Sequence, residues 1–410
     1  MGKKSNQKSI IITGFPYAYP YYFKVFEYVE SKDNLIFILP KRWEAKKGKV
    51  KIGLAKRADF KIFGLSACSF GGKSLFGGLF KGWTPFICLI LPYVRLKYGS
   101  RVLYSCLEPN LLTTLYNGFW AKLFGYKHVL FTWQNVAPEK RMSGLKLKLS
   151  NMLVKLNLAL SDGIICGNTK AAEIIRKWKT EDGKWKILVC PLSGVDTEKF
   201  KPVGNEQIQQ AKRSNDKIIL FYGALEKRKG IDVLINAFNI LNTKYLIHDT
   251  KLVIVGTGPE SESLKLKVSA GGGSAFGGKS LKLDEKTVFL DWMTNDELPA
   301  LLNSADVFVY PSRRVGGWEE QFGYAMAEAS ACGVPVVATK TGSIDEVVVD
   351  GKSGILVEPN NSEQLAEAMN KILSDSNLAK QMGEFGRNYV VENFSHEVIA
   401  KKIIYFLRSF

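Results

Sequence analysis

The amino-acid sequence predicts an α/β protein made of two doubly wound domains, each with a parallel sheet between layers of helices. The chain has 410 residues, which is more than one ordinary hydrophobic core holds. Short apolar segments alternate with helix-length segments, and this alternation occurs twice. A stretch rich in proline, glycine and polar residues separates the two series at 191–216. We therefore expect domains over residues 1–195 and 196–394, with a terminal helix over 395–410 that could cross back to the first domain.

Six apolar segments in the N-terminal half predict buried strands, at residues 8–13, 35–39, 102–106, 128–132, 163–166 and 186–190. Ile, Val, Leu and Phe dominate them, which is typical of strands covered on both faces. Helical spacing of apolar residues predicts helices over 111–124, 145–160 and 170–178. This order indicates a parallel sheet with helical crossovers.

The C-terminal half repeats the pattern. Strands are predicted at 217–222, 251–255, 287–290, 307–310, 334–339 and 355–357, and helices at 231–241, 295–302, 321–332, 362–373 and 395–407. Ligands of doubly wound sheets bind outside the carboxyl ends of the strands. We therefore expect the functional residues in the loops that follow these strands.

The charge of the chain is unevenly distributed between its halves. Residues 1–200 contain 33 Lys/Arg and 13 Asp/Glu, a net charge of +20, whereas residues 201–410 contain 24 and 26, a net charge of −2. Such asymmetry indicates an anionic partner for the basic half: nucleic acid, a membrane surface or a phosphorylated substrate. The alternative is a lysine-rich surface that only keeps the protein in solution.

Several classes of protein are disfavoured by composition. The six cysteines are scattered without a CxxC pair, so we expect free thiols in a reducing compartment and no structural zinc. The first fifteen residues lack the apolar core of a signal peptide, and the longest uncharged apolar run, 83–94, is too short to span a bilayer. The three histidines have no partner at the spacing of a nucleophile–base pair.

One motif is expected to be misleading. Residues 273–280 match the phosphate-cradling pattern G-x4-G-K-S, and the hexapeptide FGGKSL occurs at both 70–75 and 276–281. A functional phosphate loop follows a buried strand and opens a helix, and neither copy has that setting. We therefore interpret both copies as surface loops.

The stretch 305–348 carries the strongest chemical signal. It contains an apolar strand, a glycine-rich loop, a predicted helix over 321–332 and a second apolar strand. Glu320 is expected at the start of the helix and Glu328 two turns further on. A helix N-terminus binds anions, and carboxylates accept hydrogen bonds from sugar hydroxyls. This combination suits a nucleotide-sugar, although both glutamates could instead be solvated helix charges.

A second candidate region follows the strand predicted at 217–222. Lys229 lies in the segment GALEKRKG, where its ammonium could neutralise a diphosphate, or it could be an exposed turn lysine. The turn GTGPE at 256–260 follows the next strand and would let a ligand approach the backbone closely.

The segment EQFGYAMAEASACGVPVVAT, beginning at Glu320, closely resembles the E-x7-E signature of retaining glycosyltransferases with the GT-B fold, of the family-four type known as glycosyl transferases group 1. The resemblance extends over residues 217–395 and includes KIILFYGALEKRKGIDVLINAF and KLVIVGTGPESESL. It implies two Rossmann-like domains facing a cleft, with the acceptor bound by the basic N-terminal domain and the donor by the C-terminal domain.

The resemblance also implies roles for individual residues. Glu320 would contact hydroxyls of the donor sugar, and Lys229 would neutralise the leaving diphosphate; these two are the expected catalytic residues. The backbone N–H groups of Phe322 and Gly323 would hold the diphosphate or sugar, and Glu328 would bind the ribose. Further donor-binding residues are expected in neighbouring turns: Gly223, Arg228, Gly256, Gly258, Trp292 and Met293. No metal is expected.

Three departures from the family pattern concern the site. Ala224 stands where the family usually has arginine, and Arg228 is the expected substitute. Tyr17 lies where a Gly-Gly loop is common, and Gln134 with Asn135 occupies a region where a histidine is common. We assign Tyr17, Gln134 and Asn135 to the acceptor side.

The predicted function is retaining transfer of a sugar from a UDP-sugar or GDP-sugar to an acceptor glycan or a polyprenyl- or lipid-linked precursor. Residues 41–61 and 73–98 combine lysines with apolar residues, which favours a peripheral location on an anionic membrane, at its cytoplasmic face. Two alternatives stay open: a non-catalytic nucleotide-sugar-binding protein, and a nucleic-acid-binding protein, for which no zinc finger or RNA-recognition signature is present.

Overall fold

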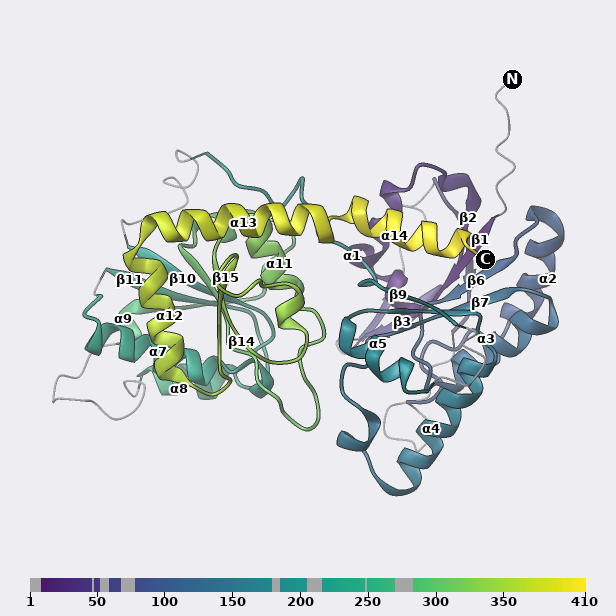
Figure 1. The fold of residues 1–410 in the computed structure, drawn as a ribbon, viewed down its shortest axis with the longest axis horizontal. Helices are drawn as coiled ribbons and strands as arrows, with labels where there is room; N and C mark the ends of the chain where they lie inside the picture. The colour runs from purple at the N-terminus through teal and green to yellow at the C-terminus, as the bar shows by residue number, and fades with distance from the viewer. Residues whose placement is uncertain are drawn as a thin grey trace. The chain divides into compact units, whose positions relative to one another are not determined.

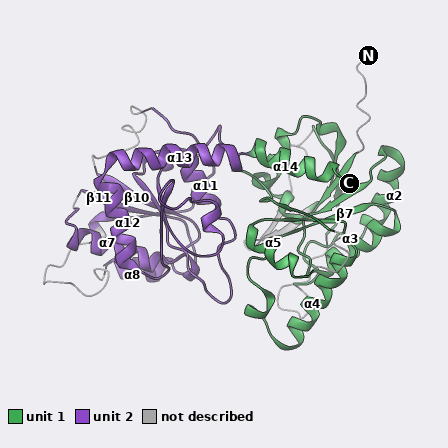
Figure 2. Cartoon of the chain, viewed as in Figure 1, with its two compact units in different colours: residues 1–194, 396–410 green, residues 195–395 purple. Residues whose placement is uncertain are grey.

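The computed structural model describes residues 9–45, 48–51, 59–67, 78–178, 185–204, 216–247, 249–269 and 283–410. The chain forms two compact units, shown in different colours in Figure 2. Unit 1 contains residues 1–194 and 396–410, and unit 2 contains residues 195–395. Both FGGKSL copies and most of the basic segment 41–61 lie outside the residues whose side chains are described.

Unit 1 is built on a seven-stranded parallel sheet of order β5-β2-β1-β6-β7-β8-β9. Its strands are β1 (Ile10–Thr13), β2 (Leu35–Pro40), β5 (Lys61–Leu65), β6 (Val102–Ser105), β7 (Lys127–Thr132), β8 (Gly163–Cys166) and β9 (Lys186–Val189). The strand β1 is wholly buried and pairs with both β2 and β6. A separate antiparallel pair joins β3 (Arg42–Ala45) to β4 (Gly48–Lys51).

Helices cover both faces of this sheet (Figure 1). The crossovers contain α2 (Ile87–Tyr98), α3 (Leu112–Leu123), α4 (Gly144–Ala159) and α5 (Thr169–Arg176). Right-handed crossovers that all run toward β9 place these four helices on one face. The helix α14 (His396–Arg408) packs against the 3-10 helix η2 (Lys24–Tyr28) on the opposite face.

Unit 2 contains a six-stranded parallel sheet of order β12-β11-β10-β13-β14-β15. Its strands are β10 (Lys217–Tyr222), β11 (Thr250–Val255), β12 (Thr287–Leu290), β13 (Val307–Tyr310), β14 (Val336–Thr339) and β15 (Gly354–Val357). In chain order this is 3-2-1-4-5-6, the arrangement of dinucleotide-binding sheets. The order reverses between β10 and β13, so a ligand crevice is expected at their carboxyl ends.

The helices of unit 2 are α7 (Ile231–Lys244), α8 (Ser261–Ser269), α9 (Leu283–Lys286), α10 (Leu298–Ser304), α11 (Tyr324–Ala331), α12 (Ser362–Ser374) and α13 (Ser376–Phe394). The helix α12 packs against α7, and α13 packs against α11 (Figure 1). The amide N–H groups that begin α12 and α13 are capped by Asn361 and Asp375.

The helix α13 is not anticipated from the sequence, because Gly383 and Gly386 weaken its helical signal. The structure explains the first of these glycines. A Cβ atom at position 383 would lie 2.0 Å from the carbonyl oxygen of Gly333, so a glycine is required where α13 crosses the end of α11. Close packing of two helices therefore overrides local propensity here.

Candidate active site

The loops after β10 and β13 bring Lys229 and Glu320 together at the carboxyl edge of the unit 2 sheet. The Lys229 ammonium lies 2.6 Å from Oε2 of Glu320, although 91 residues separate them in the chain. Both residues are buried, with exposed fractions of 6% and 7%. The predicted catalytic pair is thus one ion pair at the point where the strand order reverses.

Two further side chains hold the Glu320 carboxylate. The Tyr310 hydroxyl donates to Oε2 over 3.0 Å, and the Ser312 hydroxyl donates to the same oxygen over 3.3 Å. Lys229 also donates to the Tyr310 hydroxyl. Tyr310 ends β13 and Ser312 follows it, so the strand itself orients the carboxylate. A buried carboxylate with several donors is held in one geometry rather than sampling many.

Burial and charge oppose each other in this pair. Burial by itself would raise the pKa of Glu320, but the adjacent Lys229 ammonium and the hydrogen bonds outweigh it, so the pKa lies below the usual range. Burial lowers the pKa of Lys229 more than Glu320 raises it. Glu320 is therefore ionised at neutral pH and can accept hydrogen bonds from hydroxyl groups.

A tryptophan and a second cation adjoin the pair. The Arg228 guanidinium lies 3.9 Å from the ring centroid of Trp318 and donates to Glu226 over 2.6 Å. The Lys229 ammonium is 5.4 Å from the same ring. Trp318 is presented by a two-residue hairpin whose central glycines, Gly316 and Gly317, have φ of 57° and 73°. Arg228 and Lys229 thus place two positive charges against the hairpin that carries Trp318.

The prediction that Glu320 stands at the start of the helix is wrong. The helix α11 begins at Tyr324, after the left-handed residue Gly323 at φ 84°, so Glu320 lies in the preceding loop. The carbonyl oxygen of Glu320 accepts a hydrogen bond from the Ser343 N–H at 2.9 Å. The loop after β14, and not a helical turn, therefore fixes the backbone of Glu320.

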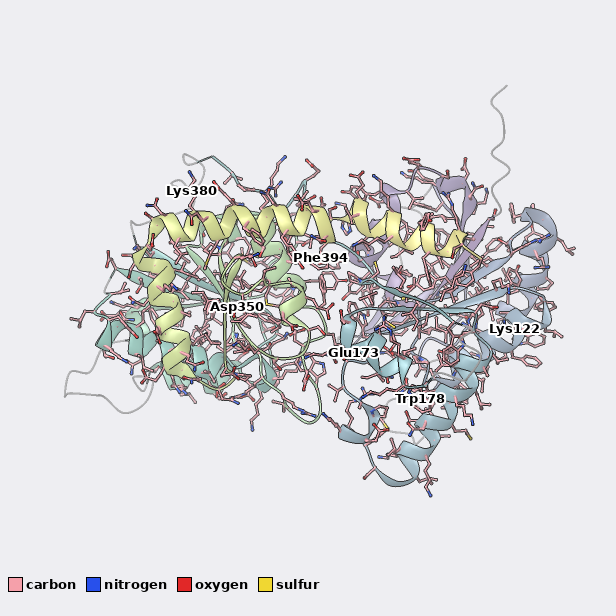
Figure 3. The ribbon with its side chains drawn as sticks, in the orientation of Figure 1. Lys122, Glu173, Trp178, Asp350, Lys380 and Phe394 are labelled. Carbon is pink, nitrogen blue, oxygen red and sulfur yellow. The ribbon has the colours of Figure 1, made fainter. Side chains whose placement is uncertain are left out.

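Phe322 and Gly323 form the entrance to α11. Phe322 is buried, and its ring centroid lies 4.8 Å from that of Tyr324 and 5.1 Å from that of Phe394, labelled in Figure 3. The first N–H groups of any α-helix have no partner within the helix and carry partial positive charge. The N-terminus of α11 is thus suited to an anion, and the aromatic contacts hold it in place.

Glu328 is on the second turn of α11 and is only 3% exposed. Burial raises the pKa of the neighbouring Cys332 thiol to about 12, and the charge of Glu328 adds to this effect. Glu328 is thus a buried acidic residue on a mostly apolar helix, eight residues after Glu320 in the chain.

The turns predicted to bind the donor lie together at the ends of β10, β11 and β12. A Cβ atom on Gly256 would lie 2.0 Å from the carbonyl oxygen of Gly223, and one on Gly258 would lie 2.2 Å from that of Leu225. The Trp292 ring lies 5.5 Å from the Tyr222 ring and is 52% exposed. Met293 follows it and is half-buried. An exposed indole beside two close turns can stack on a flat base.

The residues assigned to the acceptor side are in unit 1. Tyr17 is completely buried, and its hydroxyl donates to the Leu192 carbonyl oxygen over 3.1 Å and lies 3.3 Å from the Tyr104 hydroxyl. Gln134 and Asn135 follow β7 and are 9% and 8% exposed. In this structure Tyr17 belongs to the core of unit 1, while Gln134 and Asn135 lie just past the carboxyl end of β7.

Sequence reasoning missed Glu108, which follows β6. Its carboxylate accepts hydrogen bonds from the Thr132 hydroxyl at 2.7 Å and the Trp133 N–H at 2.9 Å. Burial raises the pKa of Glu108, and these hydrogen bonds oppose the shift. The available signal was an acidic residue in the loop after a buried strand, where ligands of doubly wound sheets bind. Glu108 therefore ties the end of β6 to the loop that carries Gln134.

The described residues contain neither a metal-ligand cluster nor a membrane-spanning helix. No group of three His, Cys, Asp or Glu side chains in this part of the chain could hold a metal ion. Within the same residues, no helix has both the length and the apolar character needed to cross a bilayer.

Residues 204–389 match the family model described as glycosyl transferases group 1. This segment of the chain belongs to that family. The match covers most of unit 2, including the Lys229–Glu320 pair and α11. The family assignment and the predicted GT-B fold are thus confirmed, while the roles of individual residues stay predictions.

Curated relatives match about half of the chain. A GDP-mannose-dependent alpha-(1-6)-phosphatidylinositol monomannoside mannosyltransferase of Mycolicibacterium smegmatis is 35% identical over 206 residues, 49% of this chain and 51% of the relative. A D-inositol 3-phosphate glycosyltransferase of Corynebacterium urealyticum is 31% identical over 225 residues, 53% of this chain and 50% of the relative. The chain spans about half the length of these relatives.

Solved structures resemble the whole chain. Sucrose-phosphate synthase from Thermosynechococcus elongatus has a TM-score of 0.73 at 20% identity and covers 98% of this chain and 99% of its own. Anabaena Alr3699/HepE in complex with UDP has a TM-score of 0.72 at 18% identity and covers 98% and 100%. At such identities the likeness establishes the fold.

Proposed function

We propose that this protein is a retaining glycosyltransferase that moves a sugar from a nucleoside-diphosphate-sugar to an acceptor. The observation that carries the proposal is the buried Lys229–Glu320 pair at the carboxyl edge of unit 2, beside the N-terminus of α11. This site offers positive charge for a diphosphate and a fixed carboxylate for sugar hydroxyls. Membership of the glycosyl transferases group 1 family supports the same reading.

The proposed mechanism places positive groups beside the diphosphate, where negative charge develops during the reaction. Negative charge accumulates on the diphosphate as the bond to the anomeric carbon breaks. Lys229, Arg228 and the first N–H groups of α11 stabilise that charge, because they are fixed before the reaction begins. Glu320 accepts hydrogen bonds from the sugar hydroxyls and holds the anomeric carbon in position for transfer to the acceptor. These groups supply the charge neutralisation that a metal ion provides in other enzymes, and we propose that the reaction needs none.

The nucleotide would lie along the turns that contain Gly223, Gly256 and Gly258. Trp292 and Met293 would flank the base, and Glu328 would accept hydrogen bonds from the ribose hydroxyls. The named activity of the Mycolicibacterium smegmatis relative uses GDP-mannose, and the Anabaena HepE structure contains UDP. We therefore propose a UDP-sugar or a GDP-sugar as donor.

The acceptor would be a glycan or lipid-linked precursor bound through unit 1, at the loop with Gln134 and Asn135. Two relatives have names that specify a phosphatidylinositol mannoside and an inositol phosphate, both of which carry phosphate. The net charge of +20 on residues 1–200 matches such an acceptor. It also supports a peripheral location at the cytoplasmic face of an anionic membrane.

The test combines donor binding with transfer. Thermal-shift screening of UDP- and GDP-sugars identifies the donor, and release of the free nucleotide then reports transfer. Glu320→Gln and Lys229→Met should each lower the transfer rate by about a hundredfold or more. Glu319→Ala is the matched control, because this neighbouring carboxylate pairs with Arg314 at 3.6 Å and not with Lys229.

Near-normal rates in both variants would refute the assignment. A donor that raises the melting temperature without any transfer would favour the alternative of a non-catalytic nucleotide-sugar-binding protein. Ala224 supports that alternative, because the arginine usual in the family at this position is absent and Arg228 would have to replace it. Transfer that is unchanged after chelation of divalent ions would support the metal-independent mechanism.

A further inference from the structure

The outer surface of three neighbouring helices in unit 1 combines apolar and basic side chains. The helices α2, α3 and α4 lie side by side, since α2 packs against α3 and α3 against α4 (Figure 1). Together they contain six Lys/Arg and no Asp or Glu. We call their solvent-exposed side the basic helix face.

The helix α2 is apolar on both sides. Ile87, Leu91 and Val94 are completely buried in the core of unit 1. On the opposite side, Leu89 and Leu96 are 65% and 88% exposed, with the half-exposed ring of Tyr93 between them. A surface helix normally turns a polar side toward water. The exposed side of α2 is therefore built for contact with something apolar.

The other two helices continue this pattern. On α3, Phe119 and Leu123 are more than half exposed and four residues apart, so they share one side of the helix. On α4, the exposed residues Leu145, Met152 and Leu156 are interspersed with three lysines, Lys146, Lys148 and Lys155. Apolar contact and positive charge thus occur on the same surface.

The charge on this face is largely uncompensated. Lys122, labelled in Figure 3, pairs with Asp162 at 2.6 Å and is neutralised. No carboxylate in the described part of the chain pairs with Lys146, Lys148 or Lys155. Over residues 78–160, all of which are described, eleven Lys/Arg stand against two glutamates. The face therefore attracts an extended anionic surface.

We propose that the basic helix face docks on the headgroups of anionic phospholipids, with the exposed side chains of α2, α3 and α4 entering the acyl boundary. Lysine-rich surfaces with Leu, Phe and Tyr are typical of proteins that lie on a bilayer. Protein–protein interfaces are depleted in lysine. A second copy bound through the same face would bring the two sets of lysines together, because a two-fold interface is self-complementary.

This inference rests on the peripheral location included in the proposed function, and it names the surface responsible. It differs from the sequence-based expectation, which assigned membrane contact to residues 41–61 and 73–98. Among the described residues of these two segments, α2 belongs to the basic helix face, whereas residues 46–47, 52–58 and 73–77 lie outside the described part of the chain. The helices α3 and α4 are added by the structure.

The test is flotation of the full chain with vesicles of phosphatidylcholine, with and without phosphatidylglycerol. Binding should require phosphatidylglycerol and should weaken as salt is raised. Lys146→Gln, Lys148→Gln and Lys155→Gln together should weaken binding by on the order of a hundredfold. Leu89→Ser with Leu96→Ser should weaken it by about tenfold or more, with less effect of salt on the loss.

Two matched controls come from other surfaces. Lys352→Gln, Lys371→Gln and Lys380→Gln together remove the same charge from exposed positions of unit 2. Tyr405→Ser removes an aromatic residue that is 81% exposed on α14, on the other face of the unit 1 sheet. Both controls should bind vesicles within about twofold of the unaltered chain.

The remaining outcomes separate this inference from the proposed function. Equal vesicle binding by the face variants and their controls would overturn the docking surface. A dimer in light scattering that Leu89→Ser with Leu96→Ser abolishes would show that a second copy covers the face, and would also overturn it. The donor-induced thermal shift in the same variants reports whether unit 2 is intact. If no UDP- or GDP-sugar shifts the melting temperature of the unaltered chain while vesicle binding is normal, the proposed function is refuted and the docking surface is not.

Discussion

Lys229 and Glu320 form a buried ion pair that joins the loop after β10 to the loop after β13, with 2.6 Å between the ammonium nitrogen and the carboxylate oxygen. The pair connects the two strands at which the order of the sheet reverses. The Tyr310 and Ser312 hydroxyls donate to the same oxygen, so three side chains from two segments of the chain meet there. Stability and donor binding should therefore be coupled at this point.

Breaking the pair from one side should destabilise unit 2 strongly. Lys229→Met leaves the Glu320 carboxylate buried beside fewer positive charges, and such changes cost about 3–5 kcal/mol. The double variant Lys229→Met/Glu320→Gln should cost less than the sum of the two single changes, because no unpaired charge is left. Denaturant unfolding of the three variants measures this coupling. Additive losses would show that the two residues do not act as a pair.

Trp292 should contribute to nucleotide affinity. Its ring is half-exposed beside Tyr222, and stacking of a base on an aromatic ring contributes about 1–3 kcal/mol. Trp292→Ala should weaken UDP or GDP binding by about tenfold to a hundredfold in calorimetry, while Trp292→Phe should retain most of the affinity. Unchanged binding in Trp292→Ala would remove this residue from the base site.

His128 should make unit 1 sensitive to mild acid. It is buried, its Nε2 lies 3.0 Å from the Ser105 hydroxyl, and burial lowers its pKa to about 4 from an ordinary value of 6.5. Between pH 6.5 and 4, His128 is therefore protonated in the unfolded chain but stays neutral in the folded chain. The stabilisation is complete above pH 6.5 and decreases by about 3 kcal/mol as the pH falls to 4.

His128→Gln should flatten the pH dependence of the unfolding free energy over this window. Asp162 accepts a hydrogen bond from the backbone N–H of His128, but its own titration does not contribute to this slope. Burial would raise its pKa, but Lys122 and the other donors outweigh this, so Asp162 titrates below its usual 3.8 and outside the window. A variant with the same slope as the unaltered chain would contradict the assignment to His128.

Gly383→Ala should destabilise unit 2 although alanine favours helices. The new Cβ atom would lie 2.0 Å from the Gly333 carbonyl oxygen, and forced overpacking costs about 1–3 kcal/mol. Gly386→Ala is the matched control on the same helix. Its nearest neighbours, the Cβ atoms of Ser330 and Ser353, would both be 3.4 Å away, so the gain in helix propensity of about 1 kcal/mol should prevail. Thermal unfolding of both variants should show shifts of opposite sign.

Much of the architecture could be predicted because it depends on local pattern. The three isoleucines of β1 and the apolar residues 218–221 of β10 indicate strands without any knowledge of their partners. The same holds for Lys229 and Glu320, since both follow such strands. The order of the strands then brings the two residues together, as the rule for doubly wound sheets requires.

What could not be predicted depends on tertiary contacts. The donation of Tyr310 and Ser312 to Glu320 follows from the loop path after β13, and no spacing in the sequence reveals it. The late start of α11 follows from the left-handed backbone at Gly323. Tyr17 is assigned to the acceptor side because it lies where the family often has a Gly-Gly loop, yet its ring is buried in the interior of unit 1. Local sequence does not show which way a side chain turns.

The place of α14 has a consequence for synthesis of the protein. This helix belongs to unit 1, yet it follows all of unit 2 in the chain, and Ile399, Ile403 and Leu407 are buried in unit 1. The two ends of unit 2 meet where the Val195 N–H donates to the Phe394 carbonyl oxygen over 2.8 Å. During translation, unit 2 is therefore fully synthesised and able to fold before α14, the last helix of unit 1, has been made.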